Sequence, residues 1–385
     1  MVIGSLDPRE YNFTEYVEMS ISPDNNTMNS LDNLMMNGSD NAAKEPQQTQ
    51  VLLIVEIIIL IILCVVGLFG NLLTIVAIVR TNKLRITENY FLVNLALADI
   101  IVCVIIEPFY LLTLISGRWP FSSNTFCAIL AAMAVVALSS SVLNLLAIAV
   151  NRYFCIVQNQ RYATLYTTRR TIFYCVMIWV GSISSTIIPA GFGILGFDEP
   201  YLGCGFIDSD ESWMYQTISM VILFTFSIIT FVFCYYNIWK EAHMSSTRTK
   251  QCSSSNTTSQ VCLAGSVGTL TKLQKHLSKS KLNQQTREIQ VAKTSFIVLS
   301  AFIICWTPFV LLVVFDRTHV APGVFAPMFI LLELANSSIN PFIYAWRNQQ
   351  FRNTYKRIFT CRHFFEKSVK DVSPRQRTDD LTTKL

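Results

Sequence analysis

A few polar side chains interrupt otherwise apolar stretches of this sequence, and their types and spacing suit chemistry. Asp99 lies in the run NLALAD, and other apolar stretches carry single amide or hydroxyl side chains. These are Asn71, Ser141, Asn336, Ser337 and Asn340. Oxygen ligands around one carboxylate suit a hard cation such as sodium, together with water. A hydrogen-bonded network that only joins helices is the alternative, and the residues leave both interpretations open.

A second candidate is the arginine that ends a long uncharged run. No charged residue occurs from Trp119 to Asn151, and Arg152 follows in the stretch NRYFCIV. Glu288 precedes Trp306 by 18 residues and Arg152 follows Cys127 by 25 residues. At 1.5 Å per residue these separations are roughly 27 and 37 Å of helix, so Arg152 and Glu288 are expected at one edge of a bundle. Exposed ion pairs contribute less than about 1 kcal/mol, which suits a contact that must open.

A third candidate is the aromatic pair in FIICWTPF. Phe302 precedes Trp306 by one helical turn, and Pro308 follows two residues later. A proline inside a helix removes a backbone hydrogen bond and bends the helix. The indole beside such a bend either couples its rotamer to movement of the helix or is simply a core aromatic. Pro108, Pro189 and Pro341 are expected to interrupt three other stretches.

Seven apolar stretches must position these residues. The chain has 385 residues, of which 52% are hydrophobic and 14% charged, whereas soluble domains carry about 25% charged residues. Each stretch exceeds the roughly 20 residues that cross a bilayer as a helix, and none has the polar face of a soluble helix. They span residues 51–79, 88–116, 124–155, 171–195, 213–239, 291–315 and 323–346. The sequence therefore predicts an all-α membrane protein with seven transmembrane helices over 51–346.

The segments between the stretches divide by charge. Lys and Arg gather in residues 80–87, 156–170 and 240–293 and after residue 346, whereas Asp and Glu gather in residues 1–50 and 198–211. Because basic loops stay in the cytoplasm, we expect a multi-pass plasma-membrane protein with an extracellular N-terminus. The net charge of +5 is mostly a cytoplasmic excess. It favours anionic lipid and cytosolic partners over nucleic acid.

Two carboxyls, Glu107 and Glu333, lie in the outer halves of their stretches. Each either contacts a ligand or hydrogen-bonds a neighbouring helix. Cys127 and Cys204 lie on the same outer side, where a disulfide is allowed. The residues alone leave open whether they form a bridge or two free thiols.

The flanking segments are polar. Residues 1–50 are expected to be disordered and glycosylated at the sequons of Asn12, Asn25 and Asn37. A flexible cytoplasmic loop is expected at about 240–290 and a cytoplasmic tail at 362–385. Cys361, among basic residues, is a candidate for palmitoylation. The C-terminus, Leu385, ends a Thr-x-hydrophobic motif of the kind that PDZ domains bind.

These residues, taken in order, resemble the rhodopsin-like (class A) G-protein-coupled receptors over about 50–362. The motifs are GN at 70–71, LALAD at 95–99, Trp119, Cys127, NRY at 151–153, Trp179, Cys204, Tyr235, CWTPF at 305–309 and NPFIY at 340–344. The resemblance implies the Cys127–Cys204 disulfide. It also implies that residues 347–361 form a short amphipathic eighth helix on the membrane surface.

The resemblance further implies activation of heterotrimeric G proteins by outward movement of the sixth helix. Arg152, Tyr235 and Tyr344 would meet the G protein, and arrestin and receptor kinases would bind later. The switch would also include Asn151, Tyr153, Glu288, Asn340 and Pro341. Many relatives carry Asp where this chain has Asn151, so one carboxylate beside Arg152 is missing. The implied ligand pocket includes Ala134, Val135, Phe302, Trp306, Glu107 and Glu333.

The stretches NRYFCIV, RYATLYTTRR and FCYYNIW look like melatonin receptors and related invertebrate orphan receptors. Ligand identity does not carry over, because Leu223 stands where melatonin receptors have a ligand-facing His. Ala134 stands where aminergic receptors have Asp, and residues 323–346 lack the Lys of opsins. A small molecule or peptide is expected as ligand. The alternative function is a seven-helix transporter, ion channel or pump. No enzyme is expected, because the sequence has no HExxH motif and no evident pairing of a nucleophile with a His.

Overall fold

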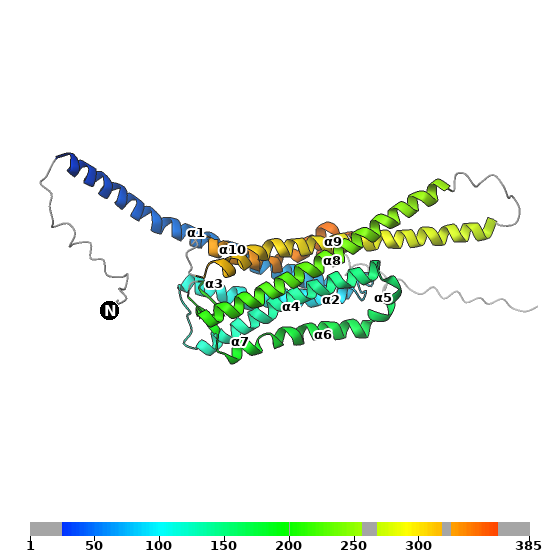
Figure 1. Ribbon diagram of the computed structural model, residues 1–385, viewed down its shortest axis with the longest axis horizontal. Helices are drawn as coiled ribbons and strands as arrows, with labels where there is room; N and C mark the ends of the chain where they lie inside the picture. Colours follow the sequence, from blue (N-terminus) through cyan, green and yellow to red (C-terminus); the bar gives the residue numbers. More distant parts are fainter. Residues whose placement is uncertain (1–24, 200, 256–267, 318–324, 361–385) are drawn as a thin grey trace, which may run out of the picture. The chain divides into compact units, whose positions relative to one another are not determined.

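The computed structural model describes residues 25–199, 201–255, 268–317 and 325–360 (Figure 1). Two compact units meet between Val55 and Glu56, and the helix bundle belongs to the unit that starts at Glu56. Asn12, Cys361 and Leu385 lie outside the described residues, as do the side chains of Asn25 and Asn37. The elements are α1 (Asn25–Arg80), α2 (Asn89–Ile101), η1 (Val102–Ile106), α3 (Glu107–Ser116), α4 (Asn124–Ile156), α5 (Asn159–Leu165), α6 (Thr168–Ser184), α7 (Ile187–Gly191), β1 (Leu195–Asp198), β2 (Gly203–Phe206), α8 (Asp210–Ser255), α9 (Gly268–Phe315), α10 (Phe325–Arg347) and α11 (Gln349–Phe359).

Six helical stretches in the described part of the chain are long and apolar enough to cross a membrane. They are Gln50–Arg80, Asn89–Ser116, Asn124–Ile156, Thr168–Gly191, Asp210–Met244 and Glu288–Phe315. The seventh predicted span corresponds to α10, which is more polar because it carries Glu333, Asn336, Ser337, Ser338 and Asn340. The all-α fold and the amphipathic helix α11 are confirmed.

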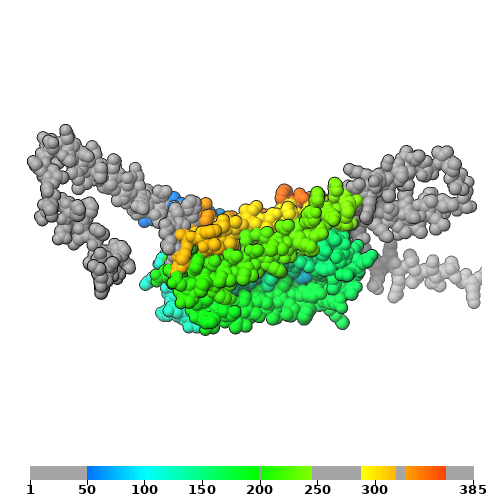
Figure 2. Space-filling view, in the orientation of Figure 1, coloured from blue at the N-terminus to red at the C-terminus, as the bar shows by residue number. Residues whose placement is uncertain are grey.

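Large apolar side chains cover the outward faces of these helices. On α8, which Figure 2 shows in light green, six such side chains are between 54% and 65% exposed. They are Ile218, Ile222, Phe226, Ile229, Val232 and Phe233. Soluble proteins rarely expose a continuous apolar face of this extent, so lipid is the solvent that fits it.

Helix α4 is the central helix of the bundle, and Figure 1 shows it between α6 and α8. Amide side chains fix its neighbours. Trp179 Nε1 on α6 donates a hydrogen bond to Asn94 Oδ1 on α2 at 2.8 Å, and Asn94 Nδ2 donates to Asn144 Oδ1 on α4 at 2.9 Å. Inside lipid such bonds take the place of the hydrophobic drive that packs soluble helices. They set the depth at which α2, α4 and α6 meet.

The prolines interrupt two helices and leave two continuous. A π-helical turn, η1, separates α2 from α3 just before Pro108. The Pro108 ring would clash with the carbonyl four residues earlier, and a wider turn relieves that clash. Helix α6 ends at Ser184 and α7 restarts before Pro189. By contrast, α9 and α10 continue through Pro308 and Pro341.

Several bounds differ from the expected ones. Helix α1 begins at Asn25 rather than 51, α8 continues to Ser255, and α9 begins at Gly268 rather than 291. Apolar stretches predict where lipid contact ends, whereas backbone hydrogen bonding continues for as long as residues tolerate helix. The short helix α5 and the antiparallel hairpin of β1 and β2 were not predicted.

Glycines let α1 approach α10 closely. A Cβ added at Gly67 would lie 2.5 Å from Ser338 Oγ and 2.5 Å from Cys103 Sγ. Ser338 Oγ donates a hydrogen bond to the Leu63 carbonyl at 2.8 Å, so it has little room to move. Small residues at a helix interface allow this approach in membranes.

We therefore expect Gly67→Val to destabilise the bundle by about 1–3 kcal/mol, because it overpacks this interface. Thermal unfolding of the purified protein measures the loss. Gly191→Ala is the matched control, since an added Cβ there meets nothing within 4 Å. Equal melting temperatures for the two variants would contradict the close packing of α1 against α10.

Candidate functional site

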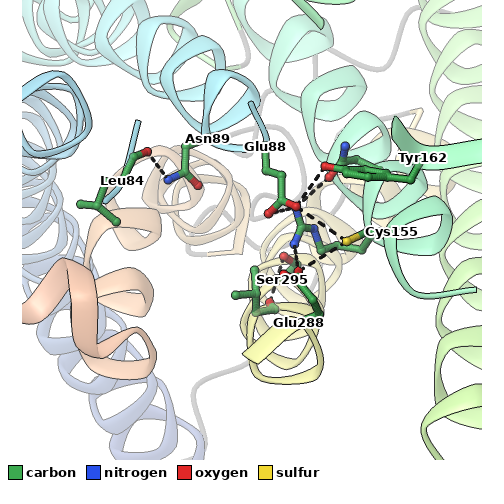
Figure 3. A network of polar contacts seen from close by, with 10 residues as sticks. Leu84, Glu88, Asn89, Cys155, Tyr162, Glu288 and Ser295 are labelled. Atoms are coloured by element: carbon green, nitrogen blue, oxygen red, sulfur yellow. Dashed lines mark hydrogen bonds and ion pairs between the residues drawn. The ribbon is translucent and has the colours of Figure 1, made fainter. Parts of the chain in front are cut away.

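Arg152, at the end of α4, lies in a cluster that joins three helices. Its side chain is only 3% exposed and forms ion pairs with Glu88 and with Glu288 of α9, the latter at 3.4 Å. Figure 3 shows Glu88, Cys155, Tyr162 and Glu288 pointing toward one another from different elements. We call the end of the bundle that carries this cluster the Arg152 end, and the opposite end the hairpin end. The contact with Glu288 was predicted from the sequence.

Glu88, the residue before α2, was missed and is the closer partner of Arg152. Its side chain is 14% exposed, against 28% for Glu288. A signal was present, because Glu88 is an acidic residue at the predicted start of the second apolar stretch. The start of that stretch and Arg152 are both expected at the cytoplasmic edge of the bundle. Glu88, directly before α2, supplies a carboxylate next to Arg152, where the neutral Asn151 supplies none.

Two further side chains hold Glu88 in place. Tyr162 of α5 donates its hydroxyl to Glu88 Oε1 at 3.0 Å, and Cys155 Sγ donates to Glu88 Oε1 at 3.7 Å and to Glu288 Oε2 at 3.4 Å. Burial, followed by the charge of Glu88, raises the pKa of Tyr162 above its usual range, so its hydroxyl remains a donor at neutral pH. Glu88, Cys155 and Glu288 offer three metal-ligand atoms within 4.8 Å of one another. The Arg152 guanidinium already pairs with both carboxylates, and its positive charge opposes a metal cation there.

Asn151 still contacts Arg152, as a neutral acceptor. Its Oδ1 accepts a hydrogen bond from Arg152 Nη2 at 2.7 Å, while its buried Nδ2 has no partner among the described residues. The neighbouring Tyr153 instead turns toward α8, where its ring lies 5.4 Å from that of Phe233. Arg152 is therefore held by one amide oxygen and two carboxylates.

The two tyrosines predicted to join the switch are buried close to this end. Tyr235 on α8 packs its ring 5.2 Å from Phe296 of α9, and Tyr344 on α10 packs 5.6 Å from Phe351 of α11. Neither hydroxyl has a hydrogen-bond partner in the described part of the chain. Each is therefore a buried donor without an acceptor, which is unfavourable.

A polar core surrounds Asp99 halfway along the bundle. Ser141 Oγ of α4 donates to Asp99 Oδ1 at 3.3 Å, and Asn340 Nδ2 of α10 donates to Asp99 Oδ2 at 2.9 Å. Asn71 Nδ2 of α1 donates to the Ser337 carbonyl at 2.9 Å. The predicted convergence of helices one, two, three and seven is thus present in the structure.

The oxygens of this core fit a hard cation. Among the described residues, the buried Oδ1 atoms of Asn336 and Asn340 have no hydrogen-bond donor. Together with the Asp99 carboxylate and the Ser141 hydroxyl they offer only oxygen ligands, the set that sodium prefers. The helix-joining bonds of Asn71 are present as well, so the two interpretations of this core are compatible.

A cavity of about 420 Å³ lies toward the hairpin end. Its walls come from α4, α8, α9 and α10, and the hairpin of β1 and β2 contributes Asp198, Cys204 and Phe206. The disulfide between Cys127 at the start of α4 and Cys204 in β2 is present, with the two Cα atoms 5.3 Å apart. It ties the hairpin to the bundle beside the cavity. This volume is within the range of small-molecule sites.

Four of the six predicted pocket residues line this cavity, namely Ala134, Val135, Trp306 and Glu333. The other two, Phe302 and Glu107, do not line it. Phe302 is 1% exposed and lies beneath Trp306, with ring centroids 5.7 Å apart, because one helical turn carries it deeper into the core. Glu107 is fully buried, and the π-helical turn before it shifts the register of its helix.

Asp198 of β1 is a cavity residue that sequence reasoning did not single out. Burial within the loop, with a further contribution from the Asp208 carboxylate, raises the pKa of Asp198 from an ordinary 3.8 to about 7. Ionisation of Asp198 therefore opposes folding. This cost is absent below about pH 4, grows between pH 4 and pH 7, and is complete above pH 7.

We accordingly expect Asp198→Asn to raise the melting temperature of the purified protein more at pH 8 than at pH 5. Thermal denaturation at both pH values measures the difference. Glu199→Gln, at the exposed neighbouring position, serves as control and is expected to show no such difference. An equal gain at both pH values for Asp198→Asn would refute a stability cost from its ionisation.

Comparisons with known proteins agree with this geometry. The model of the family "7 transmembrane receptor (rhodopsin family)" matches residues 70–344. Melatonin receptor type 1A of Ovis aries is 31% identical over 327 residues, covering 82% of this chain and 81% of that protein. Octopamine receptor beta-2R of Chilo suppressalis is 28% identical over 372 residues, covering 89% of this chain and 90% of that protein.

Among solved structures, squid rhodopsin superimposes with a TM-score of 0.65 at 22% identity, covering 80% of this chain and 86% of that chain. This likeness supports the fold. The family model spans more than half of the chain and contains the Arg152 cluster, the polar core and the cavity. It favours a receptor over the transporter, channel or pump. The chain belongs to the rhodopsin family of seven-transmembrane receptors.

Proposed function

We propose that this receptor binds an extracellular ligand in the cavity at the hairpin end and activates heterotrimeric G proteins at the Arg152 end. The observation that carries the proposal is the pairing of Arg152 with both Glu88 and Glu288. These two ion pairs join α4 to α2 and to α9. A contact that spans three helices is an element with two discrete states, closed or open.

The closed state is stable because Arg152 is buried and its charge is matched. Removing one carboxylate would leave a buried cation with less compensation, which is costly. The open state becomes favourable when a partner replaces the lost contacts. Release of Glu288 frees the end of α9, and Arg152 then becomes available to the G protein together with the hydroxyls of Tyr235 and Tyr344.

Helix α9 links the two ends of the receptor. It carries Trp306 in the cavity wall and Glu288 at the Arg152 end. Between them, Phe302 lies 6.5 Å from Phe231 and 6.4 Å from Phe224 on α8, measured between ring centroids. A ligand that shifts Trp306 would repack these rings. Because packed cores are bistable rather than continuously deformable, the shift would be passed to the inner end of α9.

The receptor is proposed to lie in the plasma membrane with its N-terminus extracellular and glycosylated, which places the Arg152 end in the cytoplasm. Arrestin and receptor kinases would bind there after activation. A sodium ion at Asp99, Ser141, Asn336 and Asn340 would bind allosterically, supplying positive charge that stabilises the closed bundle. The named relatives bear two different ligand names, melatonin and octopamine, at similar identity. Neither ligand is therefore assigned by similarity.

Reconstitution of the purified receptor in lipid nanodiscs with a panel of heterotrimeric G proteins tests the proposal. We expect at least one G protein to exchange nucleotide faster with the receptor than with empty nanodiscs, and a small-molecule and peptide screen to raise that rate further. Receptor that binds ligands from the screen without accelerating exchange by any member of the panel would overturn the proposal.

A further inference from the structure

The cavity holds two carboxyl groups and, among the described residues, no basic side chain. Two of its lining residues are acidic, Glu333 of α10 and Asp198 of β1, and none of the described lining residues is Lys, Arg or His. The remaining wall is dominated by aliphatic and aromatic side chains. Carboxylate and phosphate ligands would meet repulsion here without a basic partner. A ligand with a positive charge and an apolar body would be matched.

Glu333 is the carboxyl placed to receive that charge. It is 7% exposed, lines the cavity, and forms no hydrogen bond or ion pair with any residue that the structure describes. The nearby Tyr110 cannot satisfy it with its hydroxyl, because that hydroxyl donates to Glu56 Oε1 at 3.0 Å. A buried carboxylate without a partner is unfavourable, and a bound cation would remove that cost.

The aromatic walls near Glu333 favour the same ligand class. Trp306, Phe309 and Tyr110 line the cavity together with Glu333. Cationic groups are attracted to the faces of such rings, most strongly to indole. Gln216 and Ser219 of α8 also line the cavity and make no side-chain hydrogen bond with the described residues. They are free to bind a polar group elsewhere on a ligand.

We infer that Glu333 is the binding residue for the basic nitrogen of a small aromatic amine in this cavity. The central helix cannot supply the counter-charge, since α4 presents Ala134 and Val135 to the cavity. The charged contact is made instead from α10, on another wall. This inference rests on the proposed function only in treating the cavity as the ligand site.

Thermal stabilisation of the purified full-length receptor tests the inference without requiring a G protein. The probes are phenethylamine, tyramine and tryptamine, each paired with its N-acetyl derivative, which keeps the aromatic body and loses the charge. We expect at least one amine to raise the melting temperature, with an affinity at least tenfold above that of its acetylated partner. Absence of any stabilising amine, or acetylated partners that bind equally well, would overturn the inference.

Substitutions of single carboxyl groups show which residue binds the positively charged nitrogen of the amine. Glu333→Gln is expected to lower the affinity for the stabilising amine at least tenfold and to leave the weak binding of its acetylated partner unchanged. The double variant Glu333→Gln with Ala134→Asp returns a carboxylate to the cavity from α4 and is expected to recover amine binding. Glu107→Gln is the matched control, because Glu107 is a buried carboxyl outside the cavity. An amine affinity that falls in Asp198→Asn but not in Glu333→Gln would assign the charge to the hairpin and refute the inference.

Failure of this inference and failure of the proposed function give different results. Amines that bind through Glu333 while no G protein exchanges nucleotide would leave the inference standing and remove the function. A neutral ligand that drives nucleotide exchange equally in wild type and in Glu333→Gln would support the proposed function and overturn the inference about Glu333.

Discussion

Glu88→Gln is expected to raise ligand-independent nucleotide exchange by about tenfold, the factor that corresponds to a shift of ~1.4 kcal/mol between two states. Glu88 is the closer of the two carboxylates that hold Arg152, and it is the less exposed. Replacing it by an isosteric amide keeps an acceptor for Tyr162 but removes the charge. The closed state loses this attraction, whereas the open state, in which Arg152 has left the cluster, does not.

A double-mutant cycle separates the two carboxylates. Glu288→Gln is expected to raise exchange less than Glu88→Gln does, because its contact with Arg152 is 3.4 Å long and more exposed. Both carboxylates share one guanidinium, so the effects in the double variant are expected to be non-additive. Glu241→Gln serves as the control, because Glu241 lies on α8 and is not part of the Arg152 cluster. Exchange that stays at the wild-type rate in Glu88→Gln, with normal surface expression, would show that Glu88 does not hold the receptor closed.

Arg152→Ala is expected to abolish both basal and ligand-driven exchange. Arg152 is the cation of the cluster, and in the open state its guanidinium is the group proposed to meet the G protein. No other described cation lies within ion-pair distance of Glu88 or Glu288 to replace it. Nucleotide exchange in membranes with matched surface expression measures the loss.

The single variant also leaves two partly buried carboxylates close together without their cation, which would destabilise the fold. The matched comparison therefore uses the triple variant Arg152→Ala, Glu88→Gln, Glu288→Gln, in which no unpaired charge remains. Its reference is the double variant Glu88→Gln, Glu288→Gln, which keeps the arginine and is expected to be the most active. If the triple variant exchanges nucleotide as fast as the double variant, Arg152 has no part in activation.

Both predictions depend on a contact that the sequence indicated only in part. The pairing of Arg152 with Glu288 could be predicted, because helical rise is constant and the two residues lie at counted distances from Cys127 and Trp306. Glu88 stands just before its helix, so no comparable count along that helix applied. Its approach to Arg152 depends on the short helix α5, whose Tyr162 orients it.

For the cavity, too, the sequence predicted some of the residues and not others. The resemblance assigned Trp306, Ala134, Val135 and Glu333 to a ligand pocket, and all four line the cavity. Phe302 could not be separated from Trp306 by spacing alone, because residues one turn apart share a face but differ in depth by about 5.4 Å. For Glu107 the sequence left open a ligand contact or a helix contact, and it could not show the π-helical turn η1 that stands directly before this residue.

The sequence by itself determined the class of protein. Apolar runs of membrane length, charge asymmetry between the loops and the ordered motifs are local or one-dimensional properties, and each follows from the chain without knowledge of packing. Only the tertiary structure decided which carboxylates meet Arg152 and which carboxyl faces the cavity without a partner. The reason is physical: helix tilt, a shifted turn and the hairpin held by Cys127 and Cys204 are set by contacts between distant segments. A displacement of one residue there decides whether a charge is paired, buried or open to a ligand.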